Sequence, residues 1–231
     1  KMLTVFKEAG LQDLIKPRDL VAIKLHCGEY NNTGYLRPVF ARALADKVKE
    51  LGGRPFVCDT TTAFYSYYAG RANAVDELMT AERNGFSSAT LGCPFLVADG
   101  FLGDDDIRVD LPEGTILKEQ YIAKAIAMAD KLLVLTHFKG HGAGVFGGSI
   151  KNIGVGAASK RGKLNLHFGG HRLGFRHSPL VEHLAKEPKS PEFLEELRDS
   201  CPWGLFKING RTFEWDQEKC VCGPGGGGPC G

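Results

Sequence analysis

Short apolar runs alternate along the chain with segments whose apolar residues recur every three or four positions. The runs at residues 20–27, 55–58, 94–98 and 131–137 predict β-strands, because each is short and bounded by turn-forming residues. Residues 107–111 alternate apolar and polar side chains, which also predicts a strand. The run 131–137, KLLVLTH, carries the strongest strand pattern in the chain.

Helices are predicted between these runs. The clearest covers residues 38–51, where Pro38 occupies the first turn, Phe40, Leu44, Val48 and Leu51 follow at helical spacing, and Gly52 ends the element. Residues 71–84, 119–130 and 192–200 are the other predicted helices. We expect one shared face for Val75, Leu78 and Met79, and inward positions for Ile122 and Ile126.

The order of these elements predicts the fold class. Repeated strand–helix–strand units favour an α/β fold with a mainly parallel sheet flanked by helices. We assign this domain to residues 1–180. Residues 181–231 then form a helical linker and an irregular, cysteine-containing tail, whose last ten residues, CGPGGGGPCG, are incompatible with regular structure.

Composition narrows the protein class. Apolar residues make up 43% and charged residues 24% of the 231 residues, which is typical of a globular domain. No apolar run approaches the roughly 20 residues that a bilayer crossing requires, so we expect no membrane association. Seven cysteines, an odd number, and the absence of a visible signal peptide favour a reducing compartment, the cytoplasm.

Residues 131–181 contain no Asp or Glu. The same stretch holds eight Lys or Arg residues, five of the seven histidines and many glycines. Such a concentration of positive charge attracts anions, and glycines let a ligand approach backbone amides. The formal net charge of the whole chain is only +2, so the signal is local. A plain solvated basic face is the competing interpretation.

Polar residues follow three of the predicted strands, where ligands of open parallel sheets gather. His137, Lys139 and His141 follow one strand at every second position, and we expect the two histidines to exchange protons with a ligand beside Lys139. The residues that we expect to hold the small anionic ligand are Lys139, Lys151, Asn152 and Lys163, with Asp59 and His26 in the same crevice. The histidines, with Glu29, also suggest a metal site, which the neighbouring lysine disfavours.

Four cysteines near the C-terminus offer a second kind of site: Cys201, Cys220, Cys222 and Cys230. Structural zinc and a 4Fe-4S cluster both accept four thiolates. The spacing CxC followed by a distant cysteine differs from the ferredoxin run CxxCxxCxxxC, so the pattern leaves both metals open.

Several segments together resemble the domain of unknown function 362 family, and within it the ferredoxin-like, iron–sulfur-center members. The matching segments are residues 24–38, 52–62, 98–100, 136–163 and 213–220, the most specific being THFKGHGAGVFGGSIKNIGVGAASKRGK. The resemblance implies an α/β domain followed by ferredoxin-type cysteine motifs that bind a 4Fe-4S cluster and take part in redox chemistry. The cysteine motifs of this chain depart from that pattern, since Cys201-Pro202 is all that remains of the first, which predicts a degenerate or truncated tail.

Three function classes follow from these observations. The first is an iron–sulfur-linked redox protein, an oxidoreductase or electron carrier with a redox partner protein, whose α/β domain binds a small anionic ligand. The second is a non-redox anion-binding module with structural zinc or no metal at its cysteines. The third, nucleic-acid binding, is disfavoured because few aromatic residues lie among the basic ones.

Overall fold

The computed structural model describes residues 1–63, 70–113, 115–141, 145–167, 186–201 and 204–216. Its centre is a four-stranded sheet in the order β3-β2-β1-β6, in which all neighbouring strands run parallel. The strands are β1 (Leu20–Lys24), β2 (Arg54–Asp59), β3 (Phe95–Val97) and β6 (Lys131–Val134). The predicted α/β fold with a parallel sheet is therefore confirmed.

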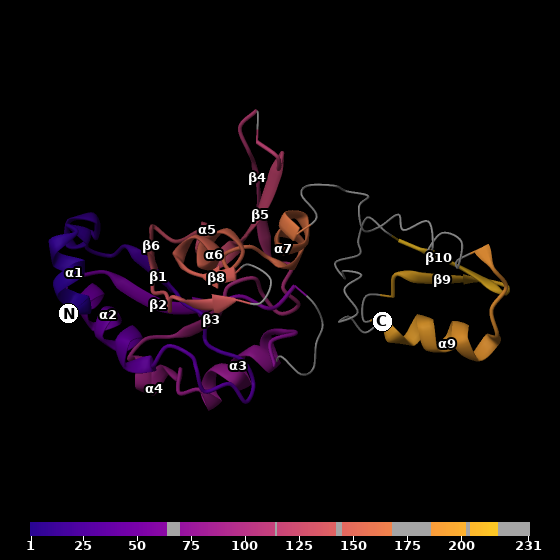
Figure 1. Ribbon diagram of the computed structural model, residues 1–231, viewed down its shortest axis with the longest axis horizontal. Coiled ribbons are helices and arrows are strands. Elements are labelled where there is room, and N and C mark those ends of the chain that lie inside the picture. Colours follow the sequence, from indigo (N-terminus) through magenta and orange to yellow (C-terminus); the bar gives the residue numbers. More distant parts are fainter. Residues whose placement is uncertain (64–69, 114, 142–144, 168–185, 202–203, 217–231) are drawn as a thin grey trace.

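Helices cover both faces of this sheet (Figure 1). On one face lie α2 (Pro38–Glu50), α3 (Ala74–Arg83) and α4 (Ser88–Leu91), preceded in the chain by α1 (Met2–Glu8) and a 3₁₀ turn (Leu11–Leu14). On the other face lie α5 (Lys124–Ala127) and α6 (Ser149–Gly154). The helix α7 (Lys160–His167) stands beside the hairpin of β4 (Asp106–Asp110) and β5 (Glu119–Ala123). This arrangement leaves the carboxyl edge of the sheet, where β1, β2 and β6 end, between the two helical layers.

Strand alternation divides the core into two layers. Val21, Ile23 and Leu25 of the β1 segment pack with Leu44 and Val48 of α2. The opposite face of the sheet is lined by smaller side chains, Ala22, Cys58, Ala98 and Ala123. These small residues let the loops that carry the functional groups approach the sheet closely.

Several predicted elements are confirmed with adjusted bounds. The helix at Pro38 ends one residue early, and its buried stripe is Ala41, Leu44, Ala45 and Val48, whereas Phe40 is exposed. The helix predicted at residues 192–200 is α9 (Pro191–Ser200), and Ser190 caps it by accepting a hydrogen bond from the Phe193 amide. In α3, Val75, Leu78 and Met79 are exposed, and the buried face carries Glu77, Thr80 and Ala81 instead.

The predicted helix at residues 119–130 is wrong in its first half. Residues Glu119–Ala123 form β5, which pairs antiparallel with β4 from Asp106↔Ala123 to Asp110↔Glu119. Ile126, by contrast, is buried in the short α5 as expected. The partner strand determines that this segment is a strand. Pairing with β4 provides the backbone hydrogen bonds that a helix would have formed internally.

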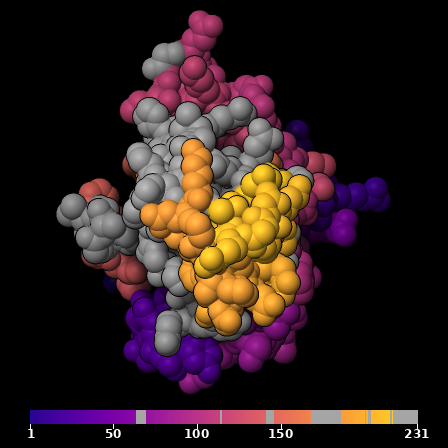
Figure 2. All heavy atoms as spheres, turned by 90° about the vertical axis from the view of Figure 1, so that its right-hand side faces the viewer, coloured from indigo at the N-terminus to yellow at the C-terminus, as the bar shows by residue number. Residues whose placement is uncertain are grey.

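A β-hairpin and a group made of one helix and two strands complete the described chain. The hairpin of β7 (Lys139–His141) and β8 (Val145–Gly147) follows β6. Farther along, α9 packs with β9 (Phe206–Asn209), which pairs antiparallel with β10 (Thr212–Trp215), and Figure 2 shows these C-terminal elements grouped together. The predicted domain boundary at residues 180/181 and the glycine-rich tail lie outside the described residues. None of the described helices has the length and apolar character that crossing a bilayer requires.

Candidate functional site

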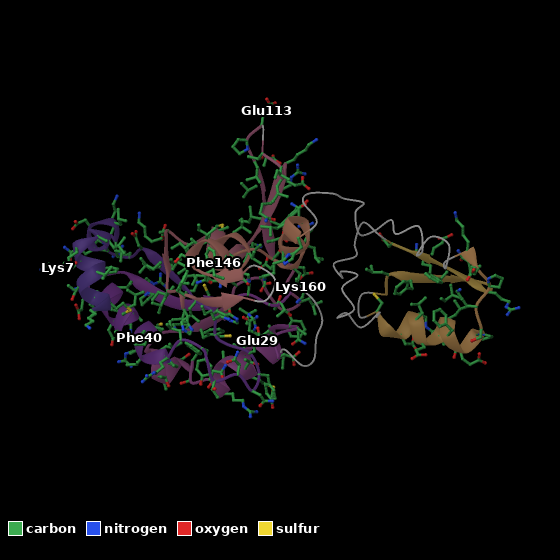
Figure 3. The ribbon with its side chains drawn as sticks, in the orientation of Figure 1. Lys7, Glu29, Phe40, Glu113, Phe146 and Lys160 are labelled. Atoms are coloured by element: carbon green, nitrogen blue, oxygen red, sulfur yellow. The ribbon has the colours of Figure 1, made fainter. Side chains whose placement is uncertain are left out.

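A cavity of about 420 Å³ opens at the carboxyl edge of the sheet. We call it the pocket. Its walls come from the residues that follow β1, β2 and β6, from the β7–β8 hairpin and from α6 and α7. In Figure 3, Glu29 of this wall and Lys160 at the start of α7 both lie toward the end of the sheet that faces away from the N-terminus.

The floor of the pocket is a buried ion pair. The Lys24 ammonium donates to Asp59 Oδ1 at 2.8 Å, and the side chains of these residues are 1% and 3% exposed. Lys24 also donates to the Leu25 carbonyl at 2.7 Å and to Asn152 Oδ1 at 2.9 Å, so all three of its protons are used. A buried ammonium with three acceptors is held in one position.

Asp59 accepts hydrogen bonds on both oxygens. The Thr60 amide donates to Oδ1 at 2.9 Å, and the Cys27 amide and the Arg71 guanidinium donate to Oδ2 at 3.0 and 3.3 Å. Burial by itself would raise the pKa of Asp59, but the charge of Lys24, the side-chain contact with His26 and the charge of Arg71 hold that pKa well below its ordinary value. Asp59 is therefore ionised across the physiological pH range.

Arg71 closes one wall. It donates to Glu29 Oε1 at 2.7 Å as well as to Asp59, and its side chain is 11% exposed. Although burial opposes its charge, the carboxylates of Asp59 and Glu29 raise the pKa of Arg71. Arg71 thus links two acids and is itself neutralised by them.

His26 is a neutral imidazole beside this network. Burial, followed by the charge of Arg71, lowers the pKa of His26 below its ordinary value of 6.5. Its Nδ1 lies 3.2 Å from the Gly28 amide nitrogen and 3.4 Å from Asp59 Oδ2. Nε2 lies 3.6 Å from Glu29 Oε1, and the side chain is 39% exposed.

Asn152 ties α6 to the floor. Besides accepting from Lys24, it donates to Thr136 Oγ1 at 3.0 Å, just beyond β6. Gly156 follows α6 at a point where a Cβ would overlap the Asn152 carbonyl oxygen and come within 3.1 Å of Lys24 Nζ. A glycine at this position lets the backbone pass directly over the lysine.

Lys163 supports the opposite side of the floor from α7. Its ammonium donates to Thr60 Oγ1 at 2.8 Å and to the Thr61 carbonyl at 2.5 Å, and it lies 3.8 Å from Asp99 Oδ2. Burial lowers the pKa of Lys163 to about 8, against the opposing charge of Asp99. Thr60 in turn donates to the Gly156 carbonyl at 2.6 Å, which joins β2 to the segment after α6.

Lys139 and Lys151 line the pocket from the hairpin and from α6. Neither side chain has a hydrogen-bond or ion-pair partner among the residues that the structure describes. Burial lowers the pKa of Lys151, and the positive charges of Lys139, Arg71 and Lys24 lower it further. His137, exposed at the rim, lines the same cavity.

The sequence-predicted residues converge on this one cavity. Its lining includes His26, Asp59, His137, Lys139, Lys151, Asn152 and Lys163. Asn152 and Lys163, expected to hold the anion, have their polar atoms engaged by the protein. The backbone of His141 belongs to β7, but its side chain lies outside the described part of the structure.

Three important residues were missed by the sequence analysis as site residues: Lys24, Arg71 and Thr136. A lysine inside the apolar run LVAIKLHC is the signal that could have revealed Lys24, because a strand buried on both faces has no water for a charge. The positive charge of the acid-free stretch is also partly balanced by acids from other segments, which its composition does not reveal. Arg161 pairs with Asp106 at 2.5 Å, and acids from other segments likewise approach Lys163.

Metal-ligating side chains gather at one place in the described residues. Sγ of Cys27 and carboxylate oxygens of Asp59 and Glu77 lie within 4.8 Å of one another, and all three residues are buried. Asp59 is already bonded to two cations, which opposes a metal ion there. The histidines of the pocket are not part of such a group in the described residues.

The four C-terminal cysteines are only partly within the described chain. Cys201 is buried where α9 ends, and its thiol is free. Cys220, Cys222 and Cys230 lie outside the described residues. The iron–sulfur and zinc alternatives therefore remain predictions from the sequence.

Comparison with known proteins gives one match. A family model described as a domain of unknown function, DUF362, matches residues 21–205, which include every element of the pocket. No curated protein and no solved structure matches the chain.

Proposed function

The chain belongs to the DUF362 family, and we propose that its α/β domain binds a small anionic ligand in the pocket. The observation that carries this proposal is a pair of lysines, Lys139 and Lys151, whose side chains have no acidic partner among the described residues. They line a cavity whose other lysine and arginine side chains are paired with acids. Two unpaired positive charges in a confined space repel each other, and an anion between them removes that repulsion.

The surrounding residues support the proposal by their fixed positions. Lys24, Asp59 and Asn152 form a rigid floor, so the lysine-bearing α6 is anchored to the sheet before any ligand arrives. A site that is organised in advance loses less conformational entropy on binding. We assign Lys139 and Lys151 to charge recognition, and the floor residues to positioning.

Acid–base chemistry on the ligand is part of the proposal. His26 and His137 both line the pocket, so two imidazoles lie where they could accept a proton from a bound ligand or donate one to it. In the redox hypothesis, such groups would move the protons that accompany electron transfer to or from the ligand. A cluster at the C-terminal cysteines, which the family resemblance suggests, would supply electrons to the ligand or accept electrons from it. The alternative is an anion-binding module that performs no redox step.

Thermal stabilisation by anions tests the binding proposal. Phosphate, sulfate and small carboxylates are added to wild type, Lys151→Gln and Lys131→Gln. Lys131 belongs to the same acid-free stretch but starts β6, at the opposite edge of the sheet, and so serves as the matched control. A charge-assisted hydrogen bond contributes about 1.5–3 kcal/mol, so Lys151→Gln is expected to weaken binding by about 10- to 100-fold. Equal responses in all three proteins would contradict the proposal and indicate diffuse surface attraction.

A further inference from the structure

The charged residues that line the pocket fall into two groups. Lys24 is paired with Asp59 at 2.8 Å, Arg71 with Glu29 at 2.7 Å, and Lys163 lies 3.8 Å from Asp99. Lys139 and Lys151 have no such partner among the described residues. Within the described part of the chain, the pocket therefore carries two positive charges that are not paired with an acid, rather than one.

These two charges act on the same small volume. Lys139 comes from β7 and Lys151 from α6, and the charge of Lys139 is the strongest of the neighbouring charges that lower the pKa of Lys151. A single compact group thus lies within the field of both. A ligand with one negative charge would leave half of this field unbalanced, whereas a compact dianion neutralises it.

We propose that the ligand is a phosphate monoester, whose dianionic phosphoryl group lies between Lys139 and Lys151. This inference rests on the proposed function and specifies its ligand class. Lysine suits this group because an ammonium contacts phosphate oxygens as a point charge, without the bidentate geometry that arginine imposes. The second pKa of a phosphate ester is about 6, so the group is a dianion at neutral pH.

The size and lining of the pocket support an organic phosphate over the inorganic ion. A cavity of about 420 Å³ lies within the range of roughly 300–1,000 Å³ that holds small organic ligands. Its lining also contains apolar side chains from four different segments: Leu36, Ala63, Leu135 and Val155. These side chains provide a surface for the carbon skeleton of the ester.

Two probes of similar shape and different charge test the inference at pH 8. Phenyl phosphate is a dianion, and benzenesulfonate is a monoanion with the same ring and a tetrahedral head. Calorimetric titration of the full chain is expected to show phenyl phosphate binding at least tenfold more tightly than benzenesulfonate. Inorganic phosphate is expected to bind more weakly than phenyl phosphate, because it leaves the apolar wall uncovered. Malonate, a less compact dianion, is expected to bind more weakly as well.

The lysine variants connect this preference to the two residues. In Lys139→Gln and Lys151→Gln, the preference for phenyl phosphate over benzenesulfonate should fall to threefold or less, whereas Lys131→Gln should retain it. Equal affinity of the wild type for both probes, or tighter binding of malonate, would overturn the phosphate inference and leave anion binding in place. Failure of every anion to bind would overturn the proposed function itself. Because the first comparison uses the wild type alone, it does not depend on how well a variant folds.

Discussion

Lys24 Nζ and Asp59 Oδ1 are 2.8 Å apart in the interior of the protein, at the ends of two adjacent strands. Asp59 has a second cation, Arg71, but Asp59 is the carboxylate that pairs with Lys24. The two members of the pair are therefore not equivalent. Loss of the acid leaves a buried ammonium without a counter-ion, whereas loss of the lysine leaves the acid with Arg71.

This asymmetry predicts the outcome of a double-mutant cycle. Removing one partner of a buried ion pair costs about 3–5 kcal/mol, and Asp59→Asn is expected to reach that range. Lys24→Met should cost less, and the double variant should be more stable than the sum of the single changes implies. Unfolding in urea measures the three free energies. The exposed pair Arg42 and Asp46, at 2.7 Å, is the control, and its coupling should be below about 1 kcal/mol. Additive effects at Lys24 and Asp59 would contradict the pairing.

The close approach of Gly156 to Lys24 predicts a contrast between two glycines. Gly156→Ala places a methyl group against the Asn152 carbonyl, and forced overpacking of this kind costs about 1–3 kcal/mol. Because Asn152 orients Lys24 and anchors α6, phosphate binding should weaken as well. Gly154→Ala, only two residues earlier, has nothing within 4 Å of the added methyl and should change neither property. Thermal unfolding with and without phosphate measures both effects, and equal behaviour of the two variants would refute the argument.

Substitution of Glu77 is expected to raise the free energy of unfolding by an amount that depends on pH. Both carboxylate oxygens of Glu77 are buried and have no hydrogen-bond partner in the described part of the chain. Burial, with the charge of Asp59, raises the pKa of Glu77 well above the ordinary 4.5. The folded protein therefore retains a proton that the unfolded chain has released above pH 4.5. Its stability contribution consequently falls as the pH rises toward the folded pKa.

Glu77→Met removes this loss. The variant is expected to equal or exceed wild type in unfolding free energy at pH 4.5, and its advantage should grow toward pH 8, by about 1.4 kcal/mol for each unit of the raised pKa that the titration crosses. Glu82→Met, on the exposed side of the same helix, should show no such trend. Urea unfolding at pH 4.5, 6 and 8 provides the measurement. A variant less stable than wild type at pH 8 would show that the carboxylate has a stabilising role.

The C-terminal cysteines predict a metal that can be assayed directly. If Cys201, Cys220, Cys222 and Cys230 hold a 4Fe-4S cluster, anaerobically purified protein should be brown and contain iron and acid-labile sulfide. Cys220→Ser should abolish the colour, whereas serine in place of the buried strand cysteine Cys58 should leave the iron content unchanged. Colourless protein with stoichiometric zinc would support the structural-zinc alternative, and metal-free protein would exclude both.

The sequence allowed the sheet to be predicted because its strands are short apolar runs separated by a well-patterned helix. The segment after Lys118 was misassigned, since Ile122 and Ile126 are spaced like a helix face and nothing local reveals the antiparallel partner of β5. For α3, three apolar residues suggested a buried face, yet they are exposed, and the buried face instead holds Glu77 beside Cys27 and Asp59. Local periodicity cannot show which face of a helix meets a polar site.

The residues of the candidate site likewise differ in whether the sequence alone could place them in the site. Residues directly after strands, such as His137 and Asp59, could be placed at one edge because the carboxyl ends of parallel strands meet there. Arg71 could not, because nothing in the local sequence shows that its side chain contacts Glu29 and Asp59. The division of the lysines into neutralised and unpartnered groups also requires coordinates, since Asp99 lies far from Lys163 in sequence.

The position of β1 has a consequence for how the pocket fluctuates. This strand is hydrogen-bonded on both sides, to β2 and β6, and residues 21–25 are at most 1% exposed. Amides in such a strand exchange with solvent only when the whole domain opens, whereas those of a short surface hairpin such as β7–β8 exchange through local openings. A ligand that contacts both Lys139 and the floor of the pocket would therefore connect the hairpin, whose amides exchange quickly, to β1, whose amides exchange most slowly. Ligand binding would then reduce deuterium uptake mainly in the hairpin, because the hairpin would open only together with the sheet.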